Sequence, residues 1–106
     1  MRVVVDPIER ELALERIREF CLGLPETSER PSHGAPTFFV RGKRAFVMVL
    51  TNHHGDGRFA LWCAAATGMQ AMLVEGLHWD EIAGIAEDAY AEVAPPALVE
   101  AARQKS

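Results

Sequence analysis

Residues 34–63 constrain the fold of this chain more than any other segment. They contain three runs rich in Phe, Val, Leu and Trp, each bounded by turn residues: 37–41, 44–51 and 58–64. The first connection, 41–43, is short enough for a hairpin, because Gly42 takes a positive φ at no steric cost. The second connection, 52–57, is longer and contains two glycines. The segment therefore predicts an antiparallel meander of three strands.

The middle run is apolar on both of its sides. Residues 45–50 read Ala-Phe-Val-Met-Val-Leu, with none of the alternation that a strand with one wet face shows. A strand of this kind has to be covered on both faces. Helices of the chain can cover one face, so the second face needs more of the same chain or another subunit. We therefore expect a homodimer.

A helix is predicted before the strands. Asp6 suits an N-cap, Pro7 suits the first helical position, and Glu9 stands three residues after the cap. Gly23 and Pro25 are expected to end this helix. Its apolar residues return roughly every three or four positions, at Ile8, Leu12, Ile17, Phe20, Cys21 and Leu24.

The remaining segments predict a loop and further helices. Polar residues 26–36 indicate a loop, and residues 68–75 indicate a short helix. A longer helix begins at Trp79, where carboxylates in the first turn suit the helix dipole, and Pro96 opens a final helix that ends near Arg103. The longer helix has an apolar stripe at helical spacing: Ile82, Ile85, Ala86, Ala89, Tyr90 and Val93.

Length and composition place these elements in one domain. The 106 residues are 49% hydrophobic and 25% charged, and no stretch approaches the ~20 apolar residues of a membrane span. Cys21 and Cys63 stand far apart in apolar surroundings, which indicates reduced, buried thiols and a cytoplasmic protein. We predict a single α+β domain over residues 1–106, with an N-terminal helix, a three-stranded meander, a short helix and C-terminal helices.

Several segments, taken in order, carry a resemblance to a known family. They are Leu24-Pro25-Glu26-Thr27, 34–46 with Phe39-Val40-Arg41-Gly42-Lys43, 52–57, Leu61-Trp62-Cys63, and 79–95 from Trp79-Asp80-Glu81 to Val93-Ala94-Pro95. In this order the chain resembles the MmcQ/YjbR-like family. The resemblance implies one helix, a three-stranded meander, a helix, two more strands and a closing helix. It also implies DNA binding, with the hairpins as wings, and it implies no catalytic group.

The chain departs from the family pattern before Trp79. There the family has a longer segment that supplies the last two strands, whereas here residues 74–78 lead almost directly to Trp79. If the chain lacks this segment, the sheet has three strands and an exposed edge that invites pairing with another chain. The alternative is that the protein has this segment and that the numbered sequence omits it. We expect the second case.

Charge is distributed unevenly along the chain. The net charge is −4, but residues 31–63 carry four basic side chains against one acidic one. An acidic chain repels polyanions at long range, so an acidic partner would approach at this basic segment. The candidate contacts to nucleic acid or to an acidic partner are Arg41, Lys43, Arg44, His53, His54 and Arg58.

Other chemistry has weaker support. His53 and His54 beside Asp56 do not match the spacing of zinc ligands, so we predict no metal and no cofactor. Cys63 lies on a strand face whose pattern indicates core, which is a poor setting for a nucleophile. The sequence thus predicts a non-enzymatic interaction module that forms a homodimer. The alternative is a weak DNA-binding protein with basic wings, and a small-molecule-binding or enzymatic domain ranks third.

Overall fold

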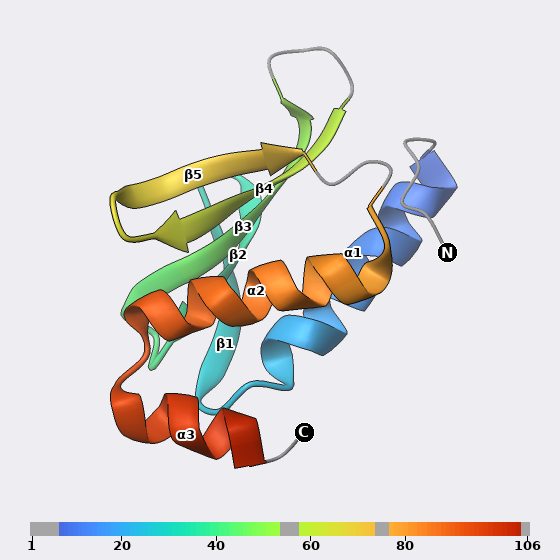
Figure 1. Cartoon of the computed structure of the whole chain (residues 1–106). Coiled ribbons are helices and arrows are strands. Elements are labelled where there is room, and N and C mark those ends of the chain that lie inside the picture. The colour runs from blue at the N-terminus through green and yellow to red at the C-terminus, as the bar shows by residue number, and fades with distance from the viewer. Residues whose placement is uncertain (1–6, 54–57, 74–76, 105–106) are drawn as a thin grey trace.

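The computed structural model describes residues 7–53, 58–73 and 77–104. Along the chain the elements are α1 (Pro7–Leu22), β1 (Thr27–Ser32), β2 (Ala35–Val40), β3 (Arg44–His53), β4 (Arg58–Ala65), β5 (Gly68–Leu73), α2 (Trp79–Val93) and α3 (Pro96–Gln104). The strands form one antiparallel sheet in the order β1-β2-β3-β4-β5 (Figure 1). The protein is α+β, as predicted, and the three predicted strands are confirmed as β2, β3 and β4.

The predicted loop over residues 26–36 is wrong. Its residues form the edge strand β1, which pairs with β2 from Thr27↔Val40 to Ser32↔Ala35. His33 and Gly34, with φ of 51° and 77°, make the two-residue turn, and positive φ at both positions suits the twist of a hairpin. A polar edge strand that contains a proline lacks the apolar alternation by which strands are found in a sequence.

The predicted short helix over residues 68–75 is also wrong. Gly68–Leu73 is the strand β5, which pairs with β4 from Ala60↔Leu73 to Ala65↔Gly68. Met, Gln, Ala and Leu favour helices in isolation, and pairing with β4 overrides that preference here. The sheet therefore has five strands. In the full sequence only residues 74–78 stand between β5 and α2, so the expectation of a segment missing from the numbered sequence is wrong.

Both C-terminal helices begin where the sequence predicts, and α1 ends as expected before Gly23. The buried face of α1 differs from the prediction. Leu12 is 64% exposed, whereas Ala13, Ile17 and Cys21, four residues apart, face the sheet. Asp6, the predicted cap of α1, lies outside the described residues.

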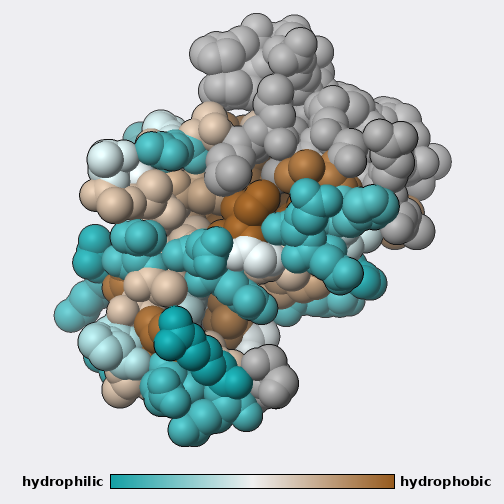
Figure 2. Space-filling view, viewed as in Figure 1, coloured by the Kyte–Doolittle hydropathy of each residue, from teal (hydrophilic) through white to brown (hydrophobic). Residues whose placement is uncertain are grey.

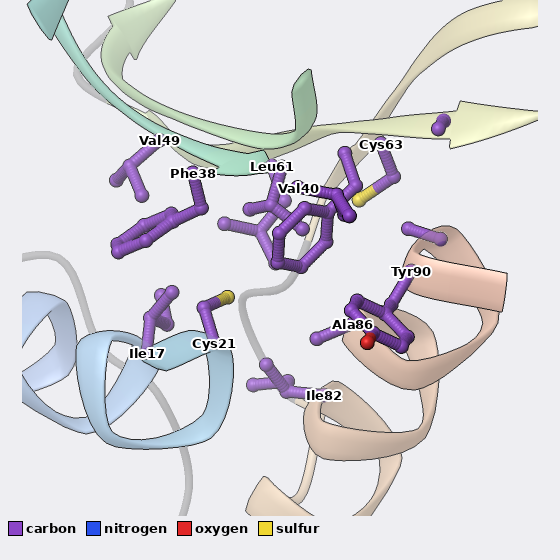
Figure 3. Packing of buried hydrophobic residues seen from close by; sticks show 14 of the residues in the cluster. Ile17, Cys21, Phe38, Val40, Val49, Leu61, Cys63, Ile82, Ala86 and Tyr90 are labelled. Atoms are coloured by element: carbon purple, nitrogen blue, oxygen red, sulfur yellow. The ribbon is translucent and has the colours of Figure 1, made fainter. Parts of the chain in front are cut away.

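The hydrophobic core lies between one face of the sheet and the helices α1 and α2 (Figure 3). Phe46 and Tyr90 meet edge-to-face with their ring centroids 5.6 Å apart. The Tyr90 hydroxyl donates a hydrogen bond to the Pro25 carbonyl at 2.9 Å, which ties α2 to the connection between α1 and β1. Phe20 of α1 packs edge-on against Trp79 of α2 at 5.9 Å.

A β-bulge explains part of the unbroken apolar run in β3. Phe38 pairs with Val47 and Phe39 pairs with Ala45, which leaves Phe46 without a partner across the ladder. Phe46 and Val47 are neighbours in sequence, yet both belong to the core between sheet and helices. The run thus lacks alternation partly because the bulge turns two successive side chains toward the same face.

Candidate functional surfaces

The six predicted basic contacts form two groups at opposite ends of β3. One group is at the β2–β3 turn: Arg41, Lys43 and Arg44. At the other end His53 and Arg58 pair in the backbone register, and His54 lies outside the described residues. At about 3.3 Å per residue, the length of β3 separates the groups by about 30 Å. The structure therefore does not bring the predicted contacts together in one patch.

Arg41 links the β2–β3 turn to the connection between α1 and β1. Its backbone N–H donates to the Glu26 carbonyl at 2.8 Å, and its Nε and Nη2 donate to the Glu26 carboxylate at 3.0 and 3.3 Å. The hydrogen bond to Glu26 raises the pKa of Arg41. The guanidinium is thus already engaged by a carboxylate, so the β2–β3 turn offers a phosphate less charge than the sequence suggests.

Arg30 is a basic residue at this end that sequence reasoning missed. Its guanidinium carbon lies 3.8 Å from the centroid of the Phe39 ring, and its Nη1 donates to the Gly42 carbonyl at 2.9 Å. Arg30 went unnoticed because residues 26–36 were assigned to a loop. The available signal was the short turn-forming pair His33-Gly34 between two runs of equal length.

Lys43 and Arg44 are also exposed at this end, and neither makes an ion pair with another described residue. Their surroundings are not purely basic. The antiparallel register of β3 and β4 brings Arg44 close to the β4–β5 turn. Asp88 and Glu92 of α2 share a shallow pocket with that turn. The carboxylates of α2 thus flank the β4–β5 turn, which the β3–β4 ladder places at the same end of the sheet as Arg44.

The remaining histidines are dispersed through the fold. His33 lies in the β1–β2 turn, and His78 precedes α2, where its backbone N–H donates to the Glu81 carboxylate at 3.4 Å. Over the described ranges, no three His, Cys, Asp or Glu side chains gather into a group that could hold a metal ion.

The two thiols are free and buried. Burial raises the pKa of Cys63 to about 11 and raises that of Cys21 further. A nucleophilic cysteine needs a lowered pKa and an open setting, so neither thiol is poised for catalysis.

The pockets that the described residues line are small. One of about 210 Å³ lies between the β4–β5 turn and α2, and one of about 150 Å³ lies between α2 and α3. Sites for small molecules usually enclose roughly 300–1,000 Å³. Around these pockets the helix side of the molecule is largely hydrophilic (Figure 2), and the carboxylates of α2 stand exposed there.

The opposite side of the sheet has a different character. Nine residues of β2–β5 that alternate away from the helices define what we call the open face: Ala35, Thr37, Phe39, Ala45, Met48, Leu50, Ala60, Trp62 and Ala71. On the edge strand β1, the register adds Ser28, Arg30 and Ser32 to the same side of the sheet. None of them belongs to the core cluster that the helices contact. No described helix packs on the open face, because α1 and α2 both lie on the other side of the sheet (Figure 1).

Part of the open face is buried by side chains of the sheet itself. Phe39, beneath the Arg30 guanidinium, is 8% exposed, and Met48, directly across from Trp62, is 7% exposed. Trp62 itself remains 39% exposed, and Ala71 beside it on β5 is also exposed. The second face of β3 is therefore covered only partly within the sheet, and the uncovered apolar surface centres on Trp62.

The comparisons with known proteins give no match among family models, curated proteins or solved structures. Among the described residues, no helix is long and apolar enough to cross a membrane.

Proposed function

We propose that this chain is a non-enzymatic interaction module of the cytoplasm and that its binding surface is the open face. The observation that carries the proposal is the absence of charge on that surface. A quarter of the residues of the chain are charged, so nine positions at the average would hold about two charges, and the nine positions of the open face have none; the charge on this side of the described sheet is Arg30 of the edge strand β1. A sheet face that only met water would be expected to be polar.

The composition of the open face supports the same proposal. The centres of protein interfaces are enriched in aromatic residues and Met and depleted of charge. The open face supplies Trp62, Phe39 and Met48 near its middle. The two free thiols support the cytoplasm, because secreted domains of this size usually pair their cysteines.

Membership in the MmcQ/YjbR-like family is part of the proposal and rests on the order of the matched segments. The order of the elements differs from the family pattern at one point. The family pattern has a helix before its last two strands, whereas here β4 turns directly into β5.

Retention on a hydrophobic column at about 1 µM protein tests whether the open face is adhesive. We expect Trp62→Lys and Ala71→Arg to elute earlier than the wild type. The matched control is Ala91→Arg, which adds the same charge at an exposed position of α2 and should elute nearly with the wild type. Equal retention of all four proteins would refute an adhesive open face.

A weak DNA-binding protein is the second candidate, and the free cations of Lys43 and Arg44 beside Arg30 favour it. Two phosphate contacts would give a salt slope of about −2 in a logarithmic plot, so binding should fade between low and physiological salt. Fluorescence anisotropy with labelled duplex DNA measures this binding. If binding survives Lys43→Glu combined with Arg44→Glu, the β2–β3 turn is not the contact and this candidate is lost.

A further inference from the structure

We infer that the partner of the open face is a second copy of this chain, packed face to face through a two-fold axis near Trp62. This inference rests on the proposed function, because it assigns an occupant to the same surface. Closed two-fold dimers are the commonest assemblies of soluble proteins, and they need one patch that is complementary to itself.

The open face has both a large exposed side chain and a small one beside it, as a self-complementary patch requires. Trp62 is the large exposed side chain, and the exposed Ala71 lies directly across from it on β5. A two-fold axis beside Trp62 lets the indole of each copy lie over Ala71 of the other. Large side chains set against small ones are what facing layers need in order to interdigitate.

Charge does not oppose this arrangement. Each copy carries a net charge of −4, but the carboxylates of α2 are on the helix side, away from the open face. Arg30 of β1 does lie on this side of the sheet, with its guanidinium over Phe39, but β1 is the edge strand, three strands from Trp62, so an axis beside Trp62 leaves Arg30 at the rim of the contact. Two open faces can therefore meet without burying an unpaired charge.

The size of the face predicts a weak dimer. Five strands spaced ~4.8 Å apart and about six residues long give a face of roughly 500 Å² in plan. Standard interfaces bury about 800 Å² on each partner. The face is thus smaller than a standard interface, so we expect a weak contact with a dissociation constant in the micromolar range or above.

Sedimentation velocity from about 10 to 300 µM tests the inference. The wild type should move from the mass of one 11.7 kDa chain toward twice that mass. Trp62→Lys and Ala71→Arg should remain monomeric, with association at least tenfold weaker. Ala71 is exposed, so its variant keeps the test valid if Trp62→Lys folds poorly. The controls Leu12→Lys, at the 64% exposed leucine of α1, and Ala91→Arg should dimerise like the wild type.

Two results would overturn the second copy as partner. One is a wild type that stays monomeric at 300 µM, and the other is dimerisation of both face variants at wild-type strength. Column retention then separates the two proposals. If the wild type is monomeric but Trp62→Lys and Ala71→Arg still elute earlier, the face is adhesive and binds a different protein. If retention is also unchanged, the proposed function fails together with the dimer.

Discussion

Thr27 shows how single side chains close the connection between α1 and β1. Its hydroxyl lies 2.8 Å from the Cys21 carbonyl and 2.9 Å from the Leu24 carbonyl, both of which lie near the end of α1. The last carbonyls of a helix have no partner within the helix, so a side chain that reaches them stabilises its end. Together with the clamp of Arg41 on Glu26, Thr27 fixes the direction in which the chain enters the sheet.

Thr27→Val should therefore lower the free energy of unfolding by about 1 kcal/mol, because the Leu24 carbonyl loses the hydroxyl donor and the Cys21 carbonyl keeps only the Leu24 N–H at 3.3 Å, while the shape of the side chain is kept. Thr27→Ser retains the hydroxyl and should lose distinctly less. Urea unfolding followed by circular dichroism measures both variants. Equal losses in the two would mean that the methyl group of Thr27, rather than its hydroxyl, stabilises this connection.

The raised pKa of Cys63 leads us to expect that the protein loses stability at alkaline pH. Burial raises its pKa from 9.0 to about 11, so the fold favours the protonated thiol. The corresponding stabilisation is complete below the unfolded pKa and is lost as the pH rises through the folded pKa. The free energy of unfolding should thus fall by about 1–2 kcal/mol between pH 9 and 11.

Cys63→Ala isolates this contribution. Cys21 and Tyr90 also have raised pKa values, so the variant should still lose stability at high pH, but with a shallower slope than the wild type. Urea midpoints at a series of pH values give the two slopes. Parallel slopes would show that Cys63 does not titrate differently in the folded and unfolded chains.

At the scale of elements, the sequence predicted the helices and strands that show regular side-chain periodicity or helix-capping residues. The apolar stripe of α2 and the three central strands follow from side-chain spacing alone. β1 and β5 were missed because their strand conformation comes from pairing with β2 and β4, which no local pattern of a polar or helix-favouring segment records. The bulge at Phe46 was missed for the same reason, since a one-residue shift of register is a property of two strands.

Gly68 and Gly84 provide a matched test of the β5 assignment. Gly68 has φ of +110° at the start of β5, whereas Gly84 lies in α2, and a Cβ added at either glycine meets nothing within 4 Å. Gly68→Ala should destabilise the fold by about 1 kcal/mol through backbone strain alone. Gly84→Ala should stabilise it by roughly 0.5–1 kcal/mol through helix propensity.

Thermal unfolding of the two variants gives opposite shifts if the assignment is correct. If residues 68–75 were helical instead, Gly68→Ala would be neutral or stabilising, as it is at Gly84. The sign of the Gly68 shift therefore decides between strand and helix.

At the scale of the whole molecule, the candidate surface could be predicted only in outline. The apolar run in β3 predicted that both of its faces need cover, whereas the bulge and the stacking of Arg30 on Phe39 account for part of the run within one chain. Trp62 drew no attention in the sequence, because an aromatic residue in a strand has no visible face until the register of the sheet is known. The basic turns drew attention by composition, although β3 holds them apart.

A dimer that forms through the open face links stability to concentration. Association stabilises the folded state by mass action, so each tenfold increase in concentration contributes up to about 0.7 kcal/mol per chain. For a domain of this size that corresponds to a rise in Tm of up to about 3 °C between 20 and 200 µM. Trp62→Lys should show a Tm that does not depend on concentration, and Leu12→Lys should follow the wild type. A concentration-independent Tm in the wild type, or a rise that Trp62→Lys shares, would mean that the open face does not join two copies.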